Sequence, residues 1–274
     1  MRKAFFNSLP KSGTNLVAKC LELFGYTQAG GLASSIVLSN HFRSKVRRML
    51  WRSVEQGYLI GIDTPVEIAR RPIDRNLSKV SDNMFIFGHL GYTADILVKV
   101  RDMGFALILI IRDPRAVLNS FVYYVVKNKS HVLHKAFCEM SVEERYLAAL
   151  QGHFSGTATL QSMRVRCKAL DPWLESDDVL KLQFEGLVGA KGGSSDELQR
   201  QTLAKICEHL AISKTKIDEV AQNLHGPGRV TFRKGQIDSW KEEIPASVVS
   251  LVNEQLADIL GVWGYPDDTR FNHL

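Results

Sequence analysis

The fold of this chain depends on the stretch Leu9-Pro10-Lys11-Ser12-Gly13-Thr14-Asn15-Leu16. A short apolar run, Ala4-Phe5-Phe6, precedes it and an amphipathic segment, 17–24, follows it. This order predicts a strand, a tight turn and a helix. The small residues of the turn let successive backbone N–H groups surround an anion, and the helix directs the positive end of its dipole at the same point. The pattern indicates a phosphate cradle with Lys11 beside it, and the alternative is an ordinary turn with a Ser/Thr helix cap.

The cradle differs from a Walker A loop. That pattern ends in Gly-Lys followed by Ser or Thr, and the hydroxyl of the last residue binds Mg²⁺. Here Lys11 comes before Gly13, and the Walker ending does not follow. A P-loop nucleotide kinase is therefore the alternative enzyme class, but the sequence lacks a recognisable Mg²⁺ ligand set, and we expect no metal site.

Composition restricts the class of protein and of ligand. The chain has 274 residues, of which 45% are hydrophobic, enough for one large core, so we expect a single domain over residues 1–274. The net charge of +6 favours a polyanionic ligand. Charge alone does not distinguish a nucleotide from a sulfated polymer or a nucleic acid.

The cysteines and the apolar runs predict a cytoplasmic protein. The four cysteines are widely spaced and no pair has metal-ligand spacing, which is typical of reduced thiols in a reducing compartment. The first strand is expected so close to residue 1 that a secretory signal does not fit before it. The longest apolar run, residues 105–111, is too short to cross a membrane.

Three further apolar runs predict strands, at residues 84–87, 106–111 and 179–184. The run 106–111 is apolar on both faces, which is typical of a central strand covered by helices on both sides. His89 follows the first of these runs, at the edge of the sheet where ligands of open α/β sheets bind. Residues 58–60 are a possible short strand.

Helical patterns alternate with these strands. The alternation predicts an α/β fold, a three-layer α/β/α sandwich with a central parallel sheet, of the P-loop-containing nucleotide-binding type. We expect loops at residues 25–39 and 189–195, a mobile connection at 128–138 and an irregular stretch at 225–244. The expected helices cover residues 92–103, 114–126, 142–170 with a break near 152–156, 198–210 and 248–260.

Two more groups of residues are suited to binding phosphate. Arg112 follows the strand at 106–111, and Ser120 lies two helical turns further on, so the two side chains can grip one phosphate. The alternative is that Arg112 pairs with Asp113. The third group is Arg233-Lys234-Gly235 with Trp240-Lys241, for which the alternative is a solvated basic loop.

A basic run lies between residues 41 and 52. Runs of this kind are usually solvated helix faces, but this one could also form a rim that attracts an anionic acceptor or cofactor. If the chain were not an enzyme, the same run would favour a polyanion-binding module. Its members are His41, Arg43, Lys45, Arg47, Arg48 and Arg52.

In this order, the three phosphate-binding signals resemble the sulfotransferases that use 3′-phosphoadenosine 5′-phosphosulfate (PAPS). Residues 10–16 resemble the 5′-phosphosulfate loop of that family, and Arg112 to Ser120 resemble its 3′-phosphate motif. Residues 233–235 with Trp240-Lys241 resemble its C-terminal motif. The resemblance covers residues 3–241.

The resemblance implies a reaction and a set of binding residues. It implies transfer of a sulfuryl group from PAPS to an acceptor hydroxyl, or to an amine, of a small molecule, lipid or carbohydrate, with 3′,5′-adenosine bisphosphate as the product and neither a nucleic-acid partner nor a membrane span. Lys11 would be both catalytic and cofactor-binding. Phe184 stands in the place of the family's tyrosine. The implied cofactor-binding residues are Lys11, Ser12, Gly13, Thr14, Asn15, Arg112, Ser120, Phe184, Arg233, Lys234 and Gly235.

The catalytic base has more than one candidate. Gly88-His89-Leu90 lies where many members have Thr-His-Leu carrying the base, which implies His89. Residues 112–115 look more like carbohydrate-type members, whose base is often a glutamate, so Glu67 is a rival and His41 a third candidate. Asp63 is a weaker acceptor-site carboxylate.

The chain departs from the family pattern at several positions, among them Asp238-Ser239, which replaces a usual Gly-Asp before Trp240. Leu16 replaces an aromatic residue that often lies near adenine, and Phe87 replaces a lysine two residues before the histidine. The second cation of the family site is therefore missing or is supplied from elsewhere. We expect the acceptor to be selected by the loops at residues 30–70 and 128–156.

Overall fold

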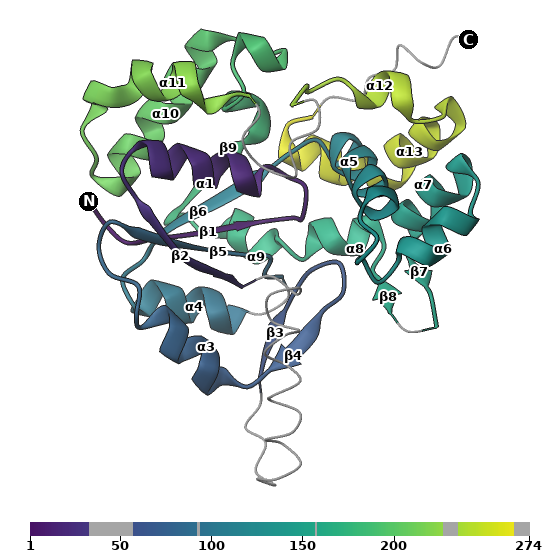
Figure 1. Cartoon of the computed structure of the whole chain (residues 1–274), viewed down its shortest axis with the longest axis horizontal. Helices are drawn as coiled ribbons and strands as arrows, with labels where there is room; N and C mark the ends of the chain where they lie inside the picture. The colour runs from purple at the N-terminus through teal and green to yellow at the C-terminus, as the bar shows by residue number, and fades with distance from the viewer. Residues whose placement is uncertain (33–56, 92–93, 157, 227–234, 266–274) are drawn as a thin grey trace, which may run out of the picture.

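The centre of the structure, a computed structural model, is a parallel sheet of five strands in the order β2-β5-β1-β6-β9 (Figure 1). The structure describes residues 1–32, 57–91, 94–156, 158–226 and 235–265. Every neighbouring pair in the sheet is parallel, which confirms the predicted α/β sandwich. The strands are β1 Ala4–Ser8, β2 Thr27–Leu32, β5 Met84–Gly88, β6 Ala106–Ile111 and β9 Val179–Gln183.

The two central strands are buried on both faces. Every residue of β1 and of β6 is buried, which the continuous apolar run at 106–111 predicts for β6. Neighbouring side chains of β1 enter different layers, because Phe5 belongs to one hydrophobic cluster and Phe6 to the other. The ring of Phe5 stacks on Trp173 at 5.7 Å, whereas Phe6 lies 5.7 Å from Phe85.

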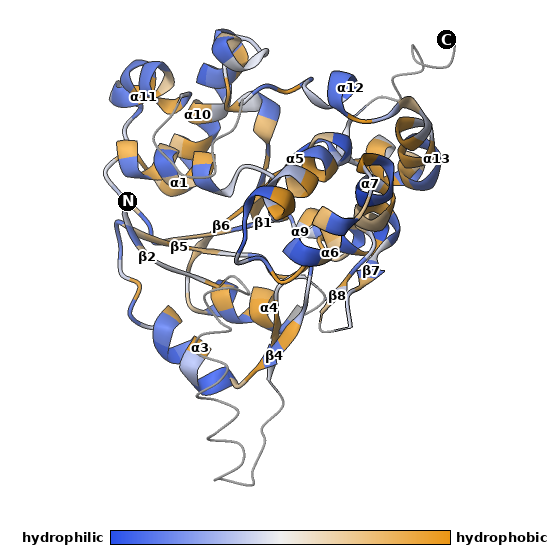
Figure 2. Ribbon diagram, turned by 45° about the vertical axis from the view of Figure 1, so that its right-hand side comes forward, coloured by the Kyte–Doolittle hydropathy of each residue, from blue (hydrophilic) through white to orange (hydrophobic). Residues whose placement is uncertain are grey.

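Helices cover both faces of this sheet, as Figure 1 shows. Figure 2 shows hydrophobic residues gathered on the strands and hydrophilic residues on α3 and α11. The smaller cluster lies under α1 Thr14–Leu23, α10 Asp196–Leu210 and α11 Ile217–Leu224. The other face and the flank of the sheet are covered by α3 Arg70–Leu77, α4 Ala94–Asp102, α5 Pro114–Lys127, α6 His134–Glu139, α7 Val142–Gln151, α8 Met163–Lys168, α9 Asp171–Glu175, α12 Trp240–Glu243 and α13 Ala246–Trp263.

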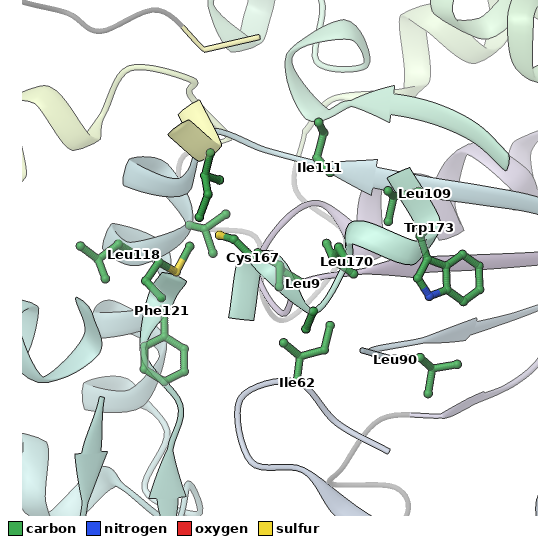
Figure 3. Close-up of a cluster of buried hydrophobic side chains, with 14 of the residues drawn as sticks. Leu9, Ile62, Leu90, Leu109, Ile111, Leu118, Phe121, Cys167, Leu170 and Trp173 are labelled. Atoms are coloured by element: carbon green, nitrogen blue, oxygen red, sulfur yellow. The ribbon is translucent and has the colours of Figure 1, made fainter. Parts of the chain in front are cut away.

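The larger cluster joins the loop after β1 to this helical flank. Figure 3 shows Leu9, Ile62 and Cys167 among its labelled side chains. Ile62 comes from an antiparallel hairpin of β3 Tyr58–Ile60 and β4 Val66–Ile68, which confirms the short strand expected at 58–60. The backbone N–H of Gly61, in the same hairpin, donates to the carbonyl of His89 at 3.0 Å, so the hairpin is fastened beside the end of β5.

The loop predicted at residues 25–39 is wrong in its first part, because residues 27–32 form the edge strand β2. Its composition of small residues carries no strand signal. The position of Gly31 explains the composition: a Cβ there would lie 2.4 Å from Cζ of Phe87 on the neighbouring strand β5. Glycine is needed for the strand to pair at this point. Residues 33–39 and the basic run at 41–52 lie outside the described residues.

Other boundaries also differ from the predictions. The break predicted near 152–156 in the helical region 142–170 is present, but it extends further, as a small hairpin of β7 His153–Phe154 and β8 Thr159–Leu160. The mobile connection predicted at 128–138 contains helix α6. Short 3₁₀ turns, η1 Phe184–Gly186, η2 Ala190–Gly192 and η3 Lys214–Lys216, complete the described elements. Within the described ranges, the helices are too short or too polar to span a membrane.

The buried side chain of Asn7 fixes the segment after β5. Its Nδ2 donates to the carbonyl of Leu90 at 2.7 Å, and the N–H of Leu90 donates to its Oδ1 at 2.8 Å. Both backbone groups of Leu90 are thus satisfied by one amide. Because Leu90 directly follows His89, this pair of bonds holds His89 against the end of β1.

The variant Asn7→Ala should lower the free energy of unfolding by about 2–4 kcal/mol, because it leaves two buried backbone groups of Leu90 without a partner. Urea denaturation followed by circular dichroism measures this change. Asn76→Ala, on an exposed turn of α3, is the control and should stay within about 0.5 kcal/mol of the unmodified protein. Equal midpoints for the two variants would show that the Asn7 bonds do not stabilise the fold.

Candidate functional site

The parallel sheet brings the predicted site residues to one edge. Because β1, β5, β6 and β9 all run in the same direction, their carboxyl ends lie together. The loop at 9–13 follows β1, His89 follows β5, Arg112 follows β6 and Phe184 follows β9. The strand-to-loop order of the sequence therefore places these groups side by side.

The loop at residues 9–13 adopts a strained, left-handed backbone. Lys11 has a φ of 75° and Gly13 a φ of 108°. Turns of this kind can form a concave nest of N–H groups that binds anions. A Cβ on Gly13 would lie 2.8 Å from Cδ2 of Phe184 and 3.0 Å from Cδ1 of Ile110, so glycine is required by both backbone and space.

Helix α1 begins immediately after this loop without the predicted alternative of a Ser/Thr cap. Its N-cap residue is Gly13, and the described part of the chain supplies no side-chain hydrogen bond to it. The hydroxyl of Thr14 is 2.9 Å from that of Ser8 on β1. The first turn of α1 therefore keeps backbone N–H groups available to an anion.

The side chain of Ser12 shows that the loop fits a phosphate-bearing group. Ser12 is buried, and its hydroxyl has no hydrogen-bond partner among the described residues. A buried hydroxyl without a partner is destabilising, and native proteins rarely leave one. An anion in the nest would supply the missing acceptor.

Arg112 connects the three predicted signals. Its Nη1 donates to the carbonyl of Lys11 at 3.4 Å, and its Nη2 donates to the carbonyl of Gln236 at 3.2 Å. Its Cζ lies 4.1 Å from the centroid of the Phe184 ring. The guanidinium therefore bridges the cradle and the C-terminal motif, with Phe184 beneath it.

The alternative pairing of Arg112 with Asp113 is replaced by another one. The carboxylate of Asp113 pairs with Arg115 at 2.8 Å, and both side chains are buried.

The other residues of the predicted 3′-phosphate site are placed in part. Ser120 lies on α5, partly buried. Gly235 precedes Gln236 and accepts a hydrogen bond from Nε2 of His225 at 3.2 Å. Arg233 and Lys234 lie outside the described residues.

The geometry of His89 determines its tautomer. Its Nδ1 is 2.8 Å from the carbonyl oxygen of Ser8. A carbonyl only accepts, so Nδ1 carries the hydrogen and Nε2 keeps its lone pair. Burial lowers the pKa of His89, while the bond to Ser8 and the charge of Asp63 raise it and Lys11 lowers it further. The net lowering leaves a neutral imidazole suited to accept a proton.

A second histidine lies close to Lys11. The Nζ of Lys11 is 4.2 Å from the ring centroid of Tyr124, and that ring meets His131 edge-on at 5.6 Å. Nδ1 of His131 accepts from the N–H of Leu133 at 3.2 Å. The sequence does not predict this contact of His131 with Tyr124 beside Lys11, because His131 falls in a stretch that looks only like a polar connection.

The two candidate carboxylates are used differently. Asp63 pairs with the buried guanidinium of Arg166 at 3.2 Å, and its charge reaches both His89 and His131. Glu67 is exposed on β4, where its Oε1 accepts from the N–H of Gly57 at 2.8 Å. Asp63 therefore acts electrostatically on His89, whereas the carboxylate of Glu67 is hydrogen-bonded next to its own hairpin.

The comparisons with known proteins agree with this architecture. Residues 2–260 match a family model described as the sulfotransferase domain. No curated protein matches the chain. Mouse sulfotransferase SULT7A1 complexed with PAP is similar in structure, at 18% identity over 94% of this chain and 84% of that chain, with a TM-score of 0.57.

Two structures of retinol dehydratase are also similar. The complex with retinol and PAP has 14% identity, covers 95% of this chain and 82% of that chain, and has a TM-score of 0.56. The complex with androsterone and inactive cofactor PAP has 15% identity, covers 95% of this chain and 81% of that chain, and has a TM-score of 0.53. At such identities the likeness shows a shared fold.

We expect His89 to titrate below the ordinary histidine range of about 6.5, because burial opposes the imidazolium. As the pH falls through about 6.5, the unfolded chain binds this proton first, so the free energy of unfolding decreases with falling pH. NMR of the imidazole C–H signals gives the pKa, and His89→Gln should remove this part of the pH dependence. A His89 pKa above the range of unfolded histidine would contradict the assigned environment.

Proposed function

Because the chain belongs to the sulfotransferase family, whose members transfer sulfuryl groups, we propose that its donor is PAPS. We propose that its acceptor is a hydroxyl, or an amine, of a small molecule, lipid or carbohydrate. The observation that supports the donor best is the position of Arg112, which joins the cradle carbonyl of Lys11 to that of Gln236. The presence of PAP in the similar structures is in line with this choice.

The nest would hold the 5′-phosphosulfate of the donor. The hydroxyl of Ser12 and the N–H groups from Gly13 to Asn15 would donate to it, with Lys11 beside them. Arg112 would bind the 3′-phosphate together with Ser120 and residues 233–235. Phe184 supports this site by filling the space beneath Gly13 and under the guanidinium.

The proposed reaction is an in-line displacement at sulfur. PAPS supplies the sulfuryl group and is released as 3′,5′-adenosine bisphosphate. Nε2 of His89 takes the proton from the acceptor oxygen as that oxygen forms its bond to sulfur and the bond from sulfur to the phosphate oxygen breaks. Lys11 and the nest N–H groups stabilise the negative charge that remains on the phosphate.

The structure supports His89 over its rivals as the base. Its Nδ1 is committed to the carbonyl of Ser8, so the nitrogen left for the acceptor is the one with a lone pair. The carboxylate of Glu67 is occupied by Gly57. His41 lies outside the described residues. Phe87, at the position of the family's second cation, has its ring 6.1 Å from that of His89 and contributes an apolar wall instead.

The cysteines support a cytoplasmic location, which we propose for this enzyme. All four are free thiols, and Cys20, Cys167 and Cys207 are buried. Such thiols persist in a reducing compartment. We also propose that residues 1–274 form one domain, since both hydrophobic clusters are built on the same sheet.

We expect 3′,5′-adenosine bisphosphate to bind at least about tenfold more tightly than 5′-AMP, because charged hydrogen bonds to the 3′-phosphate are lost with AMP. Isothermal titration calorimetry measures both affinities. Arg112→Ala should remove the difference, whereas Arg200→Ala, which loses an exposed pair with Asp218, should preserve it. Equal affinities in the unmodified protein would refute the assignment of Arg112.

The alternative functions have their own outcomes. A requirement for ATP and Mg²⁺ in turnover would indicate a kinase, and binding of sulfated polymers without turnover would indicate a polyanion-binding module.

The variant His89→Ala should lose at least about a hundredfold in kcat, the usual contribution of a general base. Its affinity for 3′,5′-adenosine bisphosphate should be unchanged, because the proposed role of His89 is toward the acceptor and not toward the donor. Single-turnover sulfation of an accepted substrate measures the effect, with Glu67→Gln as the comparison variant, for which we expect near-normal rates. Normal turnover in His89→Ala together with collapse in Glu67→Gln would assign the base to Glu67.

A further inference from the structure

A partly buried carboxylate lies near Arg112, the arginine proposed to bind the 3′-phosphate. Glu185 is in η1, directly after β9, and its Oε1 accepts from the N–H of Asp113 at 3.4 Å. Asp113 is the residue that follows Arg112. Burial raises the pKa of Glu185, and the charge of Arg112 opposes this. A carboxylate in this place is a potential competitor of a phosphate for the same guanidinium.

Tyr265 supplies a further hydrogen bond to this carboxylate. Its hydroxyl donates to Oε2 of Glu185 at 2.6 Å. The tyrosine is buried, and burial together with the charge of Glu185 raises the pKa of Tyr265, so its hydroxyl stays protonated and remains a donor. This bond is short, as expected for a hydroxyl that donates to a charged or strongly polar acceptor.

The end of α13 places Tyr265 at the sheet edge. Nε2 of Gln183, the last residue of β9, donates to the carbonyl of Trp263 at 2.9 Å. The N–H of Tyr265 donates to the carbonyl of Leu260 at 2.8 Å, which closes the end of the helix. These two bonds fix the backbone that leads into Tyr265, and its hydroxyl reaches Glu185 from there.

We propose that Tyr265 is a positioning residue of the 3′-phosphate site, which holds the Glu185 carboxylate away from the Arg112 guanidinium. This inference rests on the proposed function, in which Arg112 binds the 3′-phosphate. With Glu185 held by Tyr265 and Asp113, Arg112 stays on the face of Phe184 and between the carbonyls of Lys11 and Gln236. Without the tyrosine hydroxyl, the carboxylate turns toward the charge of Arg112 and competes with the ligand.

The test is the variant Tyr265→Phe, which removes only the hydroxyl. Calorimetry gives its affinity for 3′,5′-adenosine bisphosphate and for 5′-AMP. We expect the bisphosphate to bind at least roughly tenfold more weakly, the effect of one hydrogen bond to a charged group, while the affinity for AMP changes by less than about twofold. Only the bisphosphate carries the 3′-phosphate that Arg112 is proposed to bind. The ratio of the two affinities therefore separates a loss of Arg112 positioning from a general weakening of the nucleotide site.

Two further variants make the test specific. The double variant Tyr265→Phe/Glu185→Gln should recover the ratio of the unmodified protein, because a neutral amide does not form an ion pair with Arg112. Tyr26→Phe is the matched control: Tyr26 is also buried, and its hydroxyl donates to the carbonyl of Arg2 at 2.7 Å, near the amino end of β1. Tyr26→Phe also loses a buried tyrosine hydrogen bond, but it should keep the ratio of bisphosphate to AMP affinity of the unmodified protein.

The outcomes distinguish this inference from the proposed function. If the unmodified protein does not prefer the bisphosphate, the assignment of Arg112 fails and the role of Tyr265 fails with it. The unmodified protein could prefer the bisphosphate while Tyr265→Phe keeps that preference or weakens binding of both ligands equally. Either result would overturn only the positioning role of Tyr265. Should Tyr265→Phe not fold, Glu185→Gln alone decides: a preference that is kept or increased supports the inference, and a lost preference overturns it.

Discussion

The contact of the Arg112 guanidinium with two loops is the interaction on which the site depends. Through the carbonyls of Lys11 and Gln236 it joins the loop after β1 to a segment far away in sequence, and it does so from the end of β6. The face of Phe184 supports the guanidinium, and the same ring fills the space that a side chain on Gly13 would need. The shape of the cradle and the position of the arginine are therefore set by one aromatic ring.

The last residue of β1 couples the cradle to the proposed base in a similar way. The carbonyl of Ser8 fixes the tautomer of His89, and its hydroxyl meets Thr14 in the first turn of α1. A change in the strand end would alter both groups at once. Asn7 adds a second connection one residue earlier, through the backbone of Leu90. The cradle and the proposed base are thus held in a fixed relation by consecutive residues of one buried strand.

The sequence contains the parts of this arrangement that depend on local pattern. Apolar runs predict β6, β9 and most of β5, and the small residues around Gly13 predict the turn before α1. The strand β2 escapes prediction because Gly31 is needed for contact with Phe87, a long-range requirement that removes the usual strand signal. Asp63 comes near His89 and His131 only through the folding of distant segments. No local pattern indicates such contacts, and the same is true of Tyr265 with Glu185.

Carboxylates around the site share one property that explains how an anion site tolerates them. Asp113 is paired with Arg115, Asp63 with Arg166, and Glu185 is held by Tyr265. A buried charge without a partner is strongly destabilising, and a carboxylate next to a phosphate site would also attract the cations meant for the ligand. Giving each carboxylate its own partner removes both problems. The cationic groups proposed to bind the anion keep their geometry because the carboxylates beside them already have partners. These paired carboxylates lie between Asp113, after β6, and Asp63, in the hairpin beside His89.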